Sequence, residues 1–485
     1  MTSTFLERTS ETTPTRRNPA LGMAIVLVAQ LMLILDAAVM NVALPRIGAD
    51  LHFGAAGLSW VLNGYALAFG GLLLLGGRLG DVLGRLRLFY GGVAVFTFFS
   101  LVGGFAQTPW ELVGARIFQG VGAALAAPSV LALLTTSARD EAGRNRALAL
   151  FAAVSSGGAT LGLLLGGIVT DVGSWRWTLF INVPIGLAVL ASVRRHVVET
   201  PRRPGRFDVV GAVAATGAAV SVVWALIGTP ENGWASFRTI GSLALGAALL
   251  ALLVATESRV AHPLLRLSLF RSRRRVAGLL TMAGLVAAQY PIFFLGVQYL
   301  EVQLGYGPVA TGLAFLPISL GIFTMSRITP RLVGRFGTAP LMVIGTIGVA
   351  ASELFLTSLP ASSSYVGSVF WPFLLNGLSA GLVFMPTTVT VLADVEPEHA
   401  GSASGLLQTM QQLGSAVGVA IAASVYASHH GAGTEFVDGT SAAFTAAVVI
   451  AAVAVVSAGT LLVRRTPRRA PEPAHPLADA PIFES

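Results

Sequence analysis

The sequence Gly77-Arg78-Leu79-Gly80-Asp81-Val82-Leu83-Gly84-Arg85 lies between two apolar runs, at 56–76 and 88–106. Each run has about the 20 residues that a helix needs to cross a bilayer core of about 30 Å. The segment between them is short and carries three arginines and one aspartate. Apolar runs alternate with short polar loops in this way along the whole chain. The pattern predicts an all-α polytopic membrane protein.

The arginines indicate how the helices are oriented. All 31 basic residues are arginines. Most of them lie in every second loop, and the loops between hold only Arg46, Arg176 and Arg238. Because positively charged loops stay cytoplasmic, both termini are predicted to be cytoplasmic and the number of spans to be even. The arginine-rich segments are Arg8 to Arg17, Arg78 to Arg87, Arg139 to Arg146, Arg194 to Arg206, Arg259 to Arg275, Arg327 to Arg335 and Arg464 to Arg469. The loop at 393–401 departs from the rule, because it should be cytoplasmic and has no arginine.

Composition places the protein in the cell membrane. Hydrophobic residues make up 54% of the chain and charged residues only 11%, whereas a soluble domain carries about 25% charge. The net charge of +8 lies in short loops without interleaved aromatic residues, so we expect no nucleic-acid partner. The chain has no cysteine, and its histidines have no metal-ligand spacing beyond the pair His429-His430, which we interpret as a solvated loop. We therefore expect no metal and no cofactor.

Fourteen candidate spans divide the chain into two six-helix bundles with two extra central helices. The spans are 21–44, 56–76, 88–106, 110–134, 145–171, 177–197, 207–228, 238–256, 275–300, 309–328, 338–357, 366–392, 402–427 and 440–463. The predicted domains are a cytoplasmic tail at 1–20, a bundle at 21–197, two additional helices at 207–256, a bundle at 275–463 and a disordered cytoplasmic tail at 464–485. The first apolar run is of full span length, so we interpret it as a retained helix and not a cleaved signal peptide.

A weak internal repeat supports the division. The loop after the second span of the second bundle reads Arg331-Leu-Val-Gly-Arg335-Phe-Gly337. Arg78 aligns with Arg331, and Gly84 aligns with Gly337. Paired six-helix halves are a common transporter design, with the substrate site between them at the middle of the membrane.

Several segments together resemble one known family. They are Leu35-Asp36-Ala-Ala-Val-Met-Asn41-Val-Ala-Leu-Pro45, the loop at 76–89, Arg116-Ile-Phe-Gln119-Gly120, Gly158-Ala-Thr-Leu-Gly162-Leu-Leu-Leu-Gly166-Gly167, Trp175-Arg-Trp177, Ile181-Asn-Val-Pro184-Ile-Gly186 and Gly401-Ser-Ala-Ser-Gly405. In order and position they resemble the fourteen-span drug:proton antiporters of the major facilitator superfamily. The resemblance implies a major facilitator fold and proton-driven export of small hydrophobic or cationic drugs by alternating access. It also implies that Gly77, Asp81, Gly84 and Arg85 form a conformational latch, and that Gly158, Gly162, Gly166 and Gly167 form the antiporter motif.

Two departures from the family pattern leave a rival function open. Val82 stands where the signature loop usually has a basic residue, and Leu163 stands where the antiporter motif usually has a proline. A uniporter or an importer of a small metabolite therefore remains an alternative. A membrane-embedded enzyme or sensor is a further alternative, although enzymes of that kind usually have clustered His/Asp or Ser/His/Asp residues at one membrane face and the sequence has none. The chain also has no lysine, which excludes a P-loop.

Three ionisable residues lie well inside spans, where charge is costly and usually functional. Asp36 lies about 22 Å past Leu21, and Arg116 lies about 9 Å from the outer end of an oppositely directed span, so both are predicted at a similar depth. They can form an ion pair directly or through Gln119. A proton-sensitive carboxylate and a permanent structural pair both fit the pattern. Glu353 is either a second proton or cation site or a glutamate that reaches the outer interface.

Amide and aromatic side chains on several spans are candidates for a substrate cavity. Gln408, Gln411 and Gln412 share one helix face by their spacing. The other candidates are Asn63, Tyr65, Gln119, Gln289, Phe293, Phe294 and Asn376. Hydrogen bonds between helices explain the glutamines equally well, and ordinary packing explains the aromatic residues. The predicted partners are a small-molecule substrate, protons and the lipid bilayer, and we expect a monomer.

Overall fold

The computed structural model describes residues 19–136, 141–200, 202, 208–259, 267–359, 364–393, 395, 400–429 and 436–462. Within these ranges all regular structure is helical. The predicted tails at 1–20 and 464–485 lie outside them except for Pro19 and Ala20, and the pair His429-His430 lies at their edge, with His430 outside.

The first bundle is formed by α1 to α8. Its main packing pairs are α1 with α6 and α5 with both α3 and α4, and α8 packs against α1 and α4. The helices are α1 (Pro19–Asp50), α2 (Ala55–Leu58), α3 (Trp60–Leu83), α4 (Arg85–Gly104), α5 (Pro109–Thr136), α6 (Glu141–Val172), α7 (Trp177–Phe180) and α8 (Asn182–His196).

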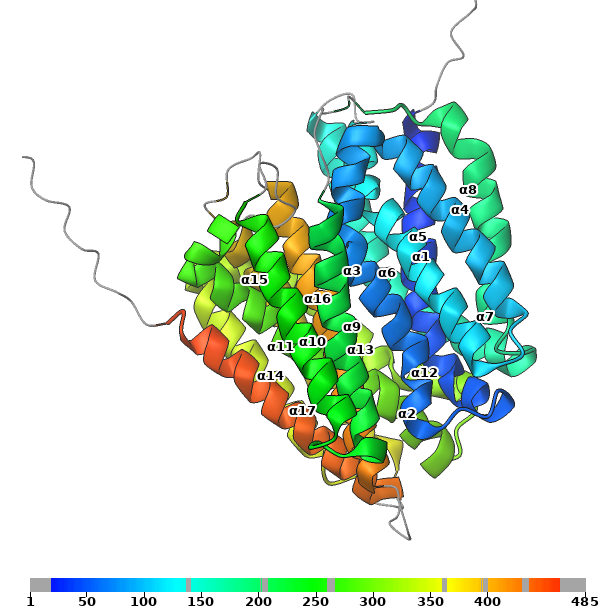
Figure 1. Cartoon of the computed structure of the whole chain (residues 1–485), viewed down its shortest axis with the longest axis vertical. Helices are drawn as coiled ribbons and strands as arrows, with labels where there is room; N and C mark the ends of the chain where they lie inside the picture. Colours follow the sequence, from blue (N-terminus) through cyan, green and yellow to red (C-terminus); the bar gives the residue numbers. More distant parts are fainter. Residues whose placement is uncertain are drawn as a thin grey trace, which may run out of the picture.

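Two helices follow between the bundles, α9 (Val209–Asn232) and α10 (Phe237–Glu257). The side chains of Asp208 and Ser236 accept hydrogen bonds from the backbone N–H groups of Gly211 and Thr239, and so cap the helix starts. Helix α9 packs against α3 of the first bundle and against α16 (Ala400–His429) of the second, and α10 packs on α9. In Figure 1 the pair lies in front, between the two bundles.

The second bundle contains α11 to α17. Helix α11 packs against α15, α16 and α17, and α14 packs against α15 and α17. The remaining elements are η1 (Leu267–Arg271), α11 (Arg273–Gln298), η2 (Tyr299–Gln303), α12 (Pro308–Ala314), α13 (Leu316–Phe336), α14 (Thr338–Leu356), η3 (Val366–Phe370), α15 (Trp371–Leu392) and α17 (Phe436–Gly459).

Twelve helical segments in the described part of the chain are long and apolar enough to cross a membrane. The predicted spans at 145–171 and 402–427 are helical too, as α6 and α16, but neither is among the twelve. In α16 the polar side chains Gln408, Gln411 and Gln412 lower the hydropathy. The described part of α6 includes one continuous apolar stretch, Leu161–Val172.

The hydrophobic cores differ between the two ends of the molecule. We call the end at which α3 meets α4 the Gly84 end, and the end at which α6 meets α7 the Trp175 end. One core joins both bundles toward the Trp175 end, with Ile47 and Leu179 from the first and Leu300 and Phe315 from the second. Toward the Gly84 end each bundle has its own core, around Phe89 in the first and around Leu279 in the second.

Candidate functional site

A buried ion pair lies inside the first bundle. Arg116 Nη1 on α5 is 2.5 Å from Asp36 Oδ2 on α1, and each residue exposes 1% of its surface. The helix starts at Pro109 with Glu111 in its first turn, where an acidic residue stabilises the helix dipole, so Arg116 falls two turns into the span. The structure thus brings together the two residues for which the sequence predicted a common depth.

Two amide groups also donate hydrogen bonds to the carboxylate of Asp36. Gln119 Nε2 donates to Asp36 Oδ1 at 3.3 Å, and Asn182 Nδ2 donates to the same oxygen at 2.8 Å. Both amides also donate to Ser100 Oγ, each at 3.0 Å, and Ser100 in turn donates to the carbonyl of Leu179. We call Asp36, Ser100, Arg116, Gln119 and Asn182 the Asp36 cluster. It joins α1, α4, α5 and α8.

The guanidinium of Arg116 has further partners. Its Nη1 donates to Gln119 Oε1 at 3.0 Å, and its Nε donates to the carbonyl of Val61 at 3.3 Å. The guanidinium carbon lies 4.4 Å from the ring centroid of Tyr65, a cation–π distance. Tyr65, predicted to face a cavity, is therefore buried against the cation of this cluster.

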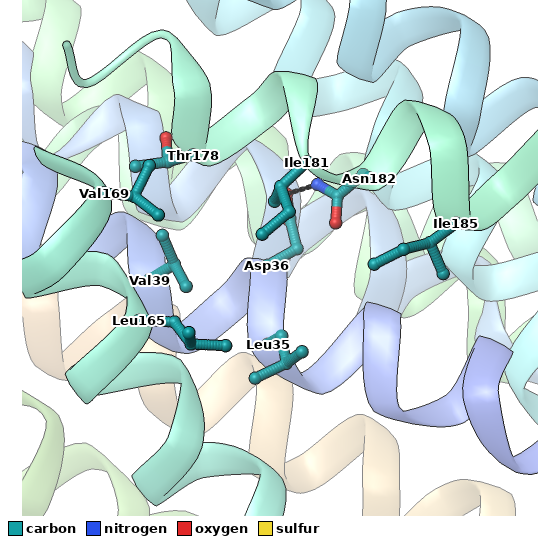
Figure 2. Close-up of a pocket in the computed structure, with 9 residues that line it drawn as sticks. All are labelled: Leu35, Asp36, Val39, Leu165, Val169, Thr178, Ile181, Asn182 and Ile185. Atoms are coloured by element: carbon teal, nitrogen blue, oxygen red, sulfur yellow. Dashed lines mark hydrogen bonds between the residues drawn. The ribbon is translucent and has the colours of Figure 1, made fainter. Parts of the chain in front are cut away.

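A small cavity of about 10 Å³ adjoins Asp36, between α1, α6, α7 and α8. Figure 2 shows the Asp36 side chain at this cavity, with the hydrogen bond from Asn182 drawn. The remaining lining is apolar except for Thr178. A volume of this size holds about one water molecule.

The four glycines of the predicted antiporter motif lie on α6. A Cβ at Gly158, Gly162 or Gly166 would meet α1, at Ile34, Ala38 and Val39 respectively. A Cβ at Gly167 would instead meet the backbone of Pro308, at the start of α12 in the second bundle. Close approach of helices needs such small residues. The motif therefore packs α6 against the helix that carries Asp36 and against the opposite bundle.

The predicted latch loop is fixed within the first bundle. Arg85 Nη2 is 2.6 Å from Asp81 Oδ1, and Arg85 Nη1 donates to the carbonyl of Pro128 at 3.0 Å. Gly84 has a φ of 113°, a conformation that only glycine adopts without strain, and so permits the turn between α3 and α4. Glu199, which the sequence did not single out, accepts hydrogen bonds from the N–H groups of Leu86 and Arg87 at the start of α4.

A second polar cluster lies in the second bundle. Gln289 Nε2 on α11 donates to Asn376 Oδ1 on α15 at 2.9 Å. Asn376 Nδ2 donates to Ser352 Oγ at 3.0 Å and to Glu353 Oε1 at 3.4 Å, both on α14. Glu353 has no exposed surface, so the interpretation that it reaches the outer interface is wrong. We call Gln289, Ser352, Glu353 and Asn376 the Glu353 cluster.

The other cavity candidates do not join either cluster. Asn63 is buried, and its amide has no hydrogen-bond partner in the described part of the chain. Phe293 stacks on Phe315, and Phe294 is buried in the core that joins the bundles. On α16 Gln408 is exposed, whereas Gln411 and Gln412 are partly buried, and a Cβ at Gly70 on α3 would overlap Gln412.

Two members of the Asp36 cluster were not predicted as site residues. Asn182 is the first residue of α8 and Pro184 is the third. Proline is tolerated in the first turn of a helix, because the N–H groups there have no acceptor within the helix. The segment Asn182-Val-Pro184 was therefore a visible signal, although it did not indicate that the amide faces Asp36. Ser100 has no signal in the sequence, because serine is common in apolar helices as a backbone-bonding residue.

Comparison with known proteins finds a family and many relatives. The sequence profile of the Major Facilitator Superfamily matches residues 26–419. The puromycin resistance protein of Streptomyces alboniger is 37% identical over 444 residues, which cover 89% of this chain and 88% of that protein. The cephamycin export protein of Amycolatopsis lactamdurans is 38% identical over 429 residues, covering 87% and 88%. The lincomycin resistance protein of Streptomyces lincolnensis is 33% identical over 446 residues, covering 91% and 90%.

Solved structures with the same fold are distant in sequence. An auto-inhibited peptide transporter of the POT family superposes with a TM-score of 0.65 at 16% identity, covering 93% of this chain and 99% of that one. The nucleoside transporter NupG superposes with a TM-score of 0.62 at 13% identity, covering 92% and 98%. At identities this low, the likeness shows only that the fold is the same.

Proposed function

This chain belongs to the major facilitator superfamily and is a drug-efflux transporter of the cell membrane, and on that premise we propose that protons entering the cell drive its export cycle. The observation that carries the proposal is the buried pair of Asp36 and Arg116. An ionisable pair at membrane depth is costly, and in transporters such residues form proton and substrate pathways.

We propose a fourteen-span arrangement with both termini in the cytoplasm. It adds α6 and α16, of 32 and 30 residues, to the twelve apolar helices. Two six-helix bundles at 21–197 and 275–463 then rock against each other, and α9 and α10 fill the region between them. The Gly84 end is the cytoplasmic end, because the arginine-rich loops lie there. The cores that are joined toward the Trp175 end and separate toward the Gly84 end fit a state that is closed to the outside.

Protonation of Asp36 is the proposed coupling step. A neutral Asp36 would lose its charge-assisted hydrogen bond to Arg116 and leave the buried guanidinium without its counter-ion. The pair would then separate, and α1 and α5 would change their packing. The cavity beside Asp36 has room for about one water, which would bring the proton to Oδ1.

The proposed substrates are antibiotics and related small molecules that are apolar or cationic. Three relatives of at least 33% identity, which this chain matches over most of their length, are named for resistance to or export of puromycin, cephamycin and lincomycin. Puromycin is therefore the first probe.

The test is uptake of puromycin into inside-out vesicles or proteoliposomes with an acidic interior. Wild-type protein should accumulate puromycin when the gradient is imposed, and Asp36→Asn should reduce this accumulation to the level of protein-free vesicles. Asp171→Asn is the matched control, because Asp171 is on α6 at the Trp175 end with its side chain 47% exposed. It should transport as the wild type does.

The outcomes separate the alternatives. Gradient-driven accumulation by Asp36→Asn would exclude Asp36 as the coupling residue. Transport that proceeds equally well without a pH gradient would favour the uniporter. Accumulation of puromycin only under the opposite gradient would favour an importer.

A further inference from the structure

The two polar clusters have the same design, one in each bundle. In the Asp36 cluster the amide group of Gln119 donates to a serine hydroxyl and to a carboxylate, and its oxygen accepts from Arg116. In the Glu353 cluster the amide group of Asn376 also donates to a serine hydroxyl and to a carboxyl group, and its oxygen accepts from Gln289.

The helix positions match as closely as the contacts do. Ser100 lies as far along α4, counted from its start at Arg85, as Glu353 lies along α14, counted from Thr338. Gln119 is likewise as far from Pro109, where α5 starts, as Asn376 is from Val366, where η3 leads into α15.

The first helices of the bundles complete the correspondence. Asp36 on α1, counted from Pro19, and Gln289 on α11, counted from Arg273, differ by a single position. The carboxyl group therefore lies on the first helix in one bundle and on the third long helix in the other. If the bundles are repeats of one unit, these matching helix positions predict a similar membrane depth for the two clusters.

The difference between the clusters is the cation. Asp36 faces a guanidinium at 2.5 Å, whereas the one hydrogen-bond partner found for the side chain of Glu353 among the described residues is the neutral amide of Asn376. Glu353 Oε2 is buried without a hydrogen-bond partner in the described part of the chain. An ionised carboxylate in such a site would cost several kcal/mol, and a group of this kind takes up a proton instead.

The ionisable residues on the helices around Glu353 do not supply a partner. On α11 they are Arg273 to Arg275 at the start of the helix and Tyr290; η2 adds Tyr299 and Glu301, and on α17 the acid is Asp438 near the start. On α13 they are Arg327, Arg331 and Arg335, all exposed, and Tyr365 before η3 donates to the carbonyl of Ala314. Helix α15 carries no ionisable residue.

We propose that Glu353 is the second proton-carrying residue of this transporter, so that one carboxyl group in each bundle takes part and two protons enter per exported molecule. Glu353 holds its proton in the present conformation. It releases the proton when the second bundle changes its packing and water reaches Oε2. The proposal rests on the proposed proton-driven export, which it extends from one coupling site to two.

The first experiment tests the proton itself and needs no substrate. A protonated carboxyl group that is buried has an infrared carbonyl band separate from those of carboxylates and amides. The purified protein at neutral pH should have this band, Glu353→Gln should lack it, and Asp36→Asn and the exposed control Glu231→Gln should keep it. Labelling the side-chain carboxyl of glutamate with ¹³C should shift the band, which assigns it to glutamate without a mutation. Absence of the band in the wild type, or its persistence in Glu353→Gln, would overturn the proposal.

The second experiment counts protons. One pH unit is worth about 1.4 kcal/mol per proton, which is a tenfold concentration ratio. At zero membrane potential and one pH unit, two protons support an accumulation ratio of puromycin of about 100-fold and one proton supports about 10-fold. Glu353→Gln should therefore lower the limiting ratio by about tenfold, and Glu353→Asp should restore part of it.

The two experiments together distinguish the possible failures. A lost infrared band with an unchanged limiting ratio would make Glu353 a neutral structural acid and overturn the proposal. A wild-type protein that accumulates no puromycin would overturn the proposed proton-driven export, and the infrared band would still decide whether Glu353 holds a proton.

Discussion

Arg116 contributes more to stability than its partner Asp36, because the two substitutions leave different groups behind. Removing Arg116 leaves a buried carboxylate without a cation, and breaking a buried pair in this way costs about 3–5 kcal/mol. In Asp36→Asn the new side chain is neutral and can still accept from the guanidinium. We therefore expect Arg116→Ala to unfold at a clearly lower temperature in detergent than Asp36→Asn does.

The double variant Asp36→Asn/Arg116→Ala is the decisive comparison, since it removes both charges. It should be more stable and better expressed than Arg116→Ala alone. A double variant no better than Arg116→Ala would show that the two residues are not energetically paired.

The contact of a single residue was predictable from the sequence where it depends only on the position of that residue along its span. Asp36 and Arg116 lie on oppositely directed spans at a matching depth, and the helical rise was enough to pair them. Ser100 and Asn182 could not be predicted, because their contacts depend on how α4 and α8 rotate about their axes. Glu353 was singled out because it lies inside an apolar run, but its burial could not be predicted, because it depends on the packing of α11, α14 and α15.

Helix α6 approaches α1 closely because glycines of α6 face α1 at their interface. A Cβ at Gly162 would meet Ala38 and the backbone of Leu35, one residue from Asp36. Gly162→Val should therefore lower the stability by about 1–3 kcal/mol through overpacking and should reduce transport. The measurements are thermal unfolding in detergent and puromycin accumulation.

Gly114→Val is the matched control for this interface, since a Cβ at Gly114 on α5 would meet nothing within 4 Å. The same β-branched residue then has the same helix propensity cost without the clash. Equal losses of stability in the two variants would show that the destabilisation by Gly162→Val does not come from a clash with α1.

The loop between α3 and α4 should act on the cycle and not on the substrate site. Asp81 pairs with Arg85, and Glu199 accepts a hydrogen bond from the N–H group of Leu86 at the start of α4. A partly exposed pair of this kind contributes up to about 1 kcal/mol, which is a fivefold change in an equilibrium. We expect Asp81→Asn to lower transport a few-fold while puromycin binding in detergent stays near the wild-type value.

Accessibility of introduced cysteines reports the conformational balance directly, because the native chain has none. Labelling rates at the two ends of the molecule should shift in Asp81→Asn if the loop biases one state. Unchanged labelling together with full transport would reduce the loop to a topological anchor.

The positions of the helices were largely predictable from the sequence, whereas the number of membrane spans was less so. Apolar runs marked the position of every long helix. The span at 402–427 was predicted from its apolar run, although Gln408, Gln411 and Gln412 make it less apolar than the others. Gln411 and Gln412 are partly buried, so hydropathy underestimates a span of this kind.

At the scale of the whole molecule, the position of α9 between the bundles limits how they can move. Helix α9 contacts α3 through Gly71, where a Cβ would overlap Thr216, and it contacts α16 through a hydrogen bond between the hydroxyl groups of Thr229 and Ser424. If the bundles rock against each other, α9 cannot keep both contacts. We expect the contact with α3 to persist, because the backbone of Gly71 faces Thr216 directly there.

We therefore expect α9 to move with the first bundle and to slide along α16 during transport. The double variant Thr229→Cys/Ser424→Cys places two thiols where two hydroxyl groups are in hydrogen-bond contact, so oxidation should form a disulfide across the α9–α16 interface. The oxidised protein should lose at least four-fifths of its puromycin transport (about 1 kcal/mol), and reduction should restore it. The single variants Thr229→Cys and Ser424→Cys should be unaffected by oxidant. Full transport by the cross-linked protein would place α9 with the second bundle, and the moving interface would then be the one at Gly71.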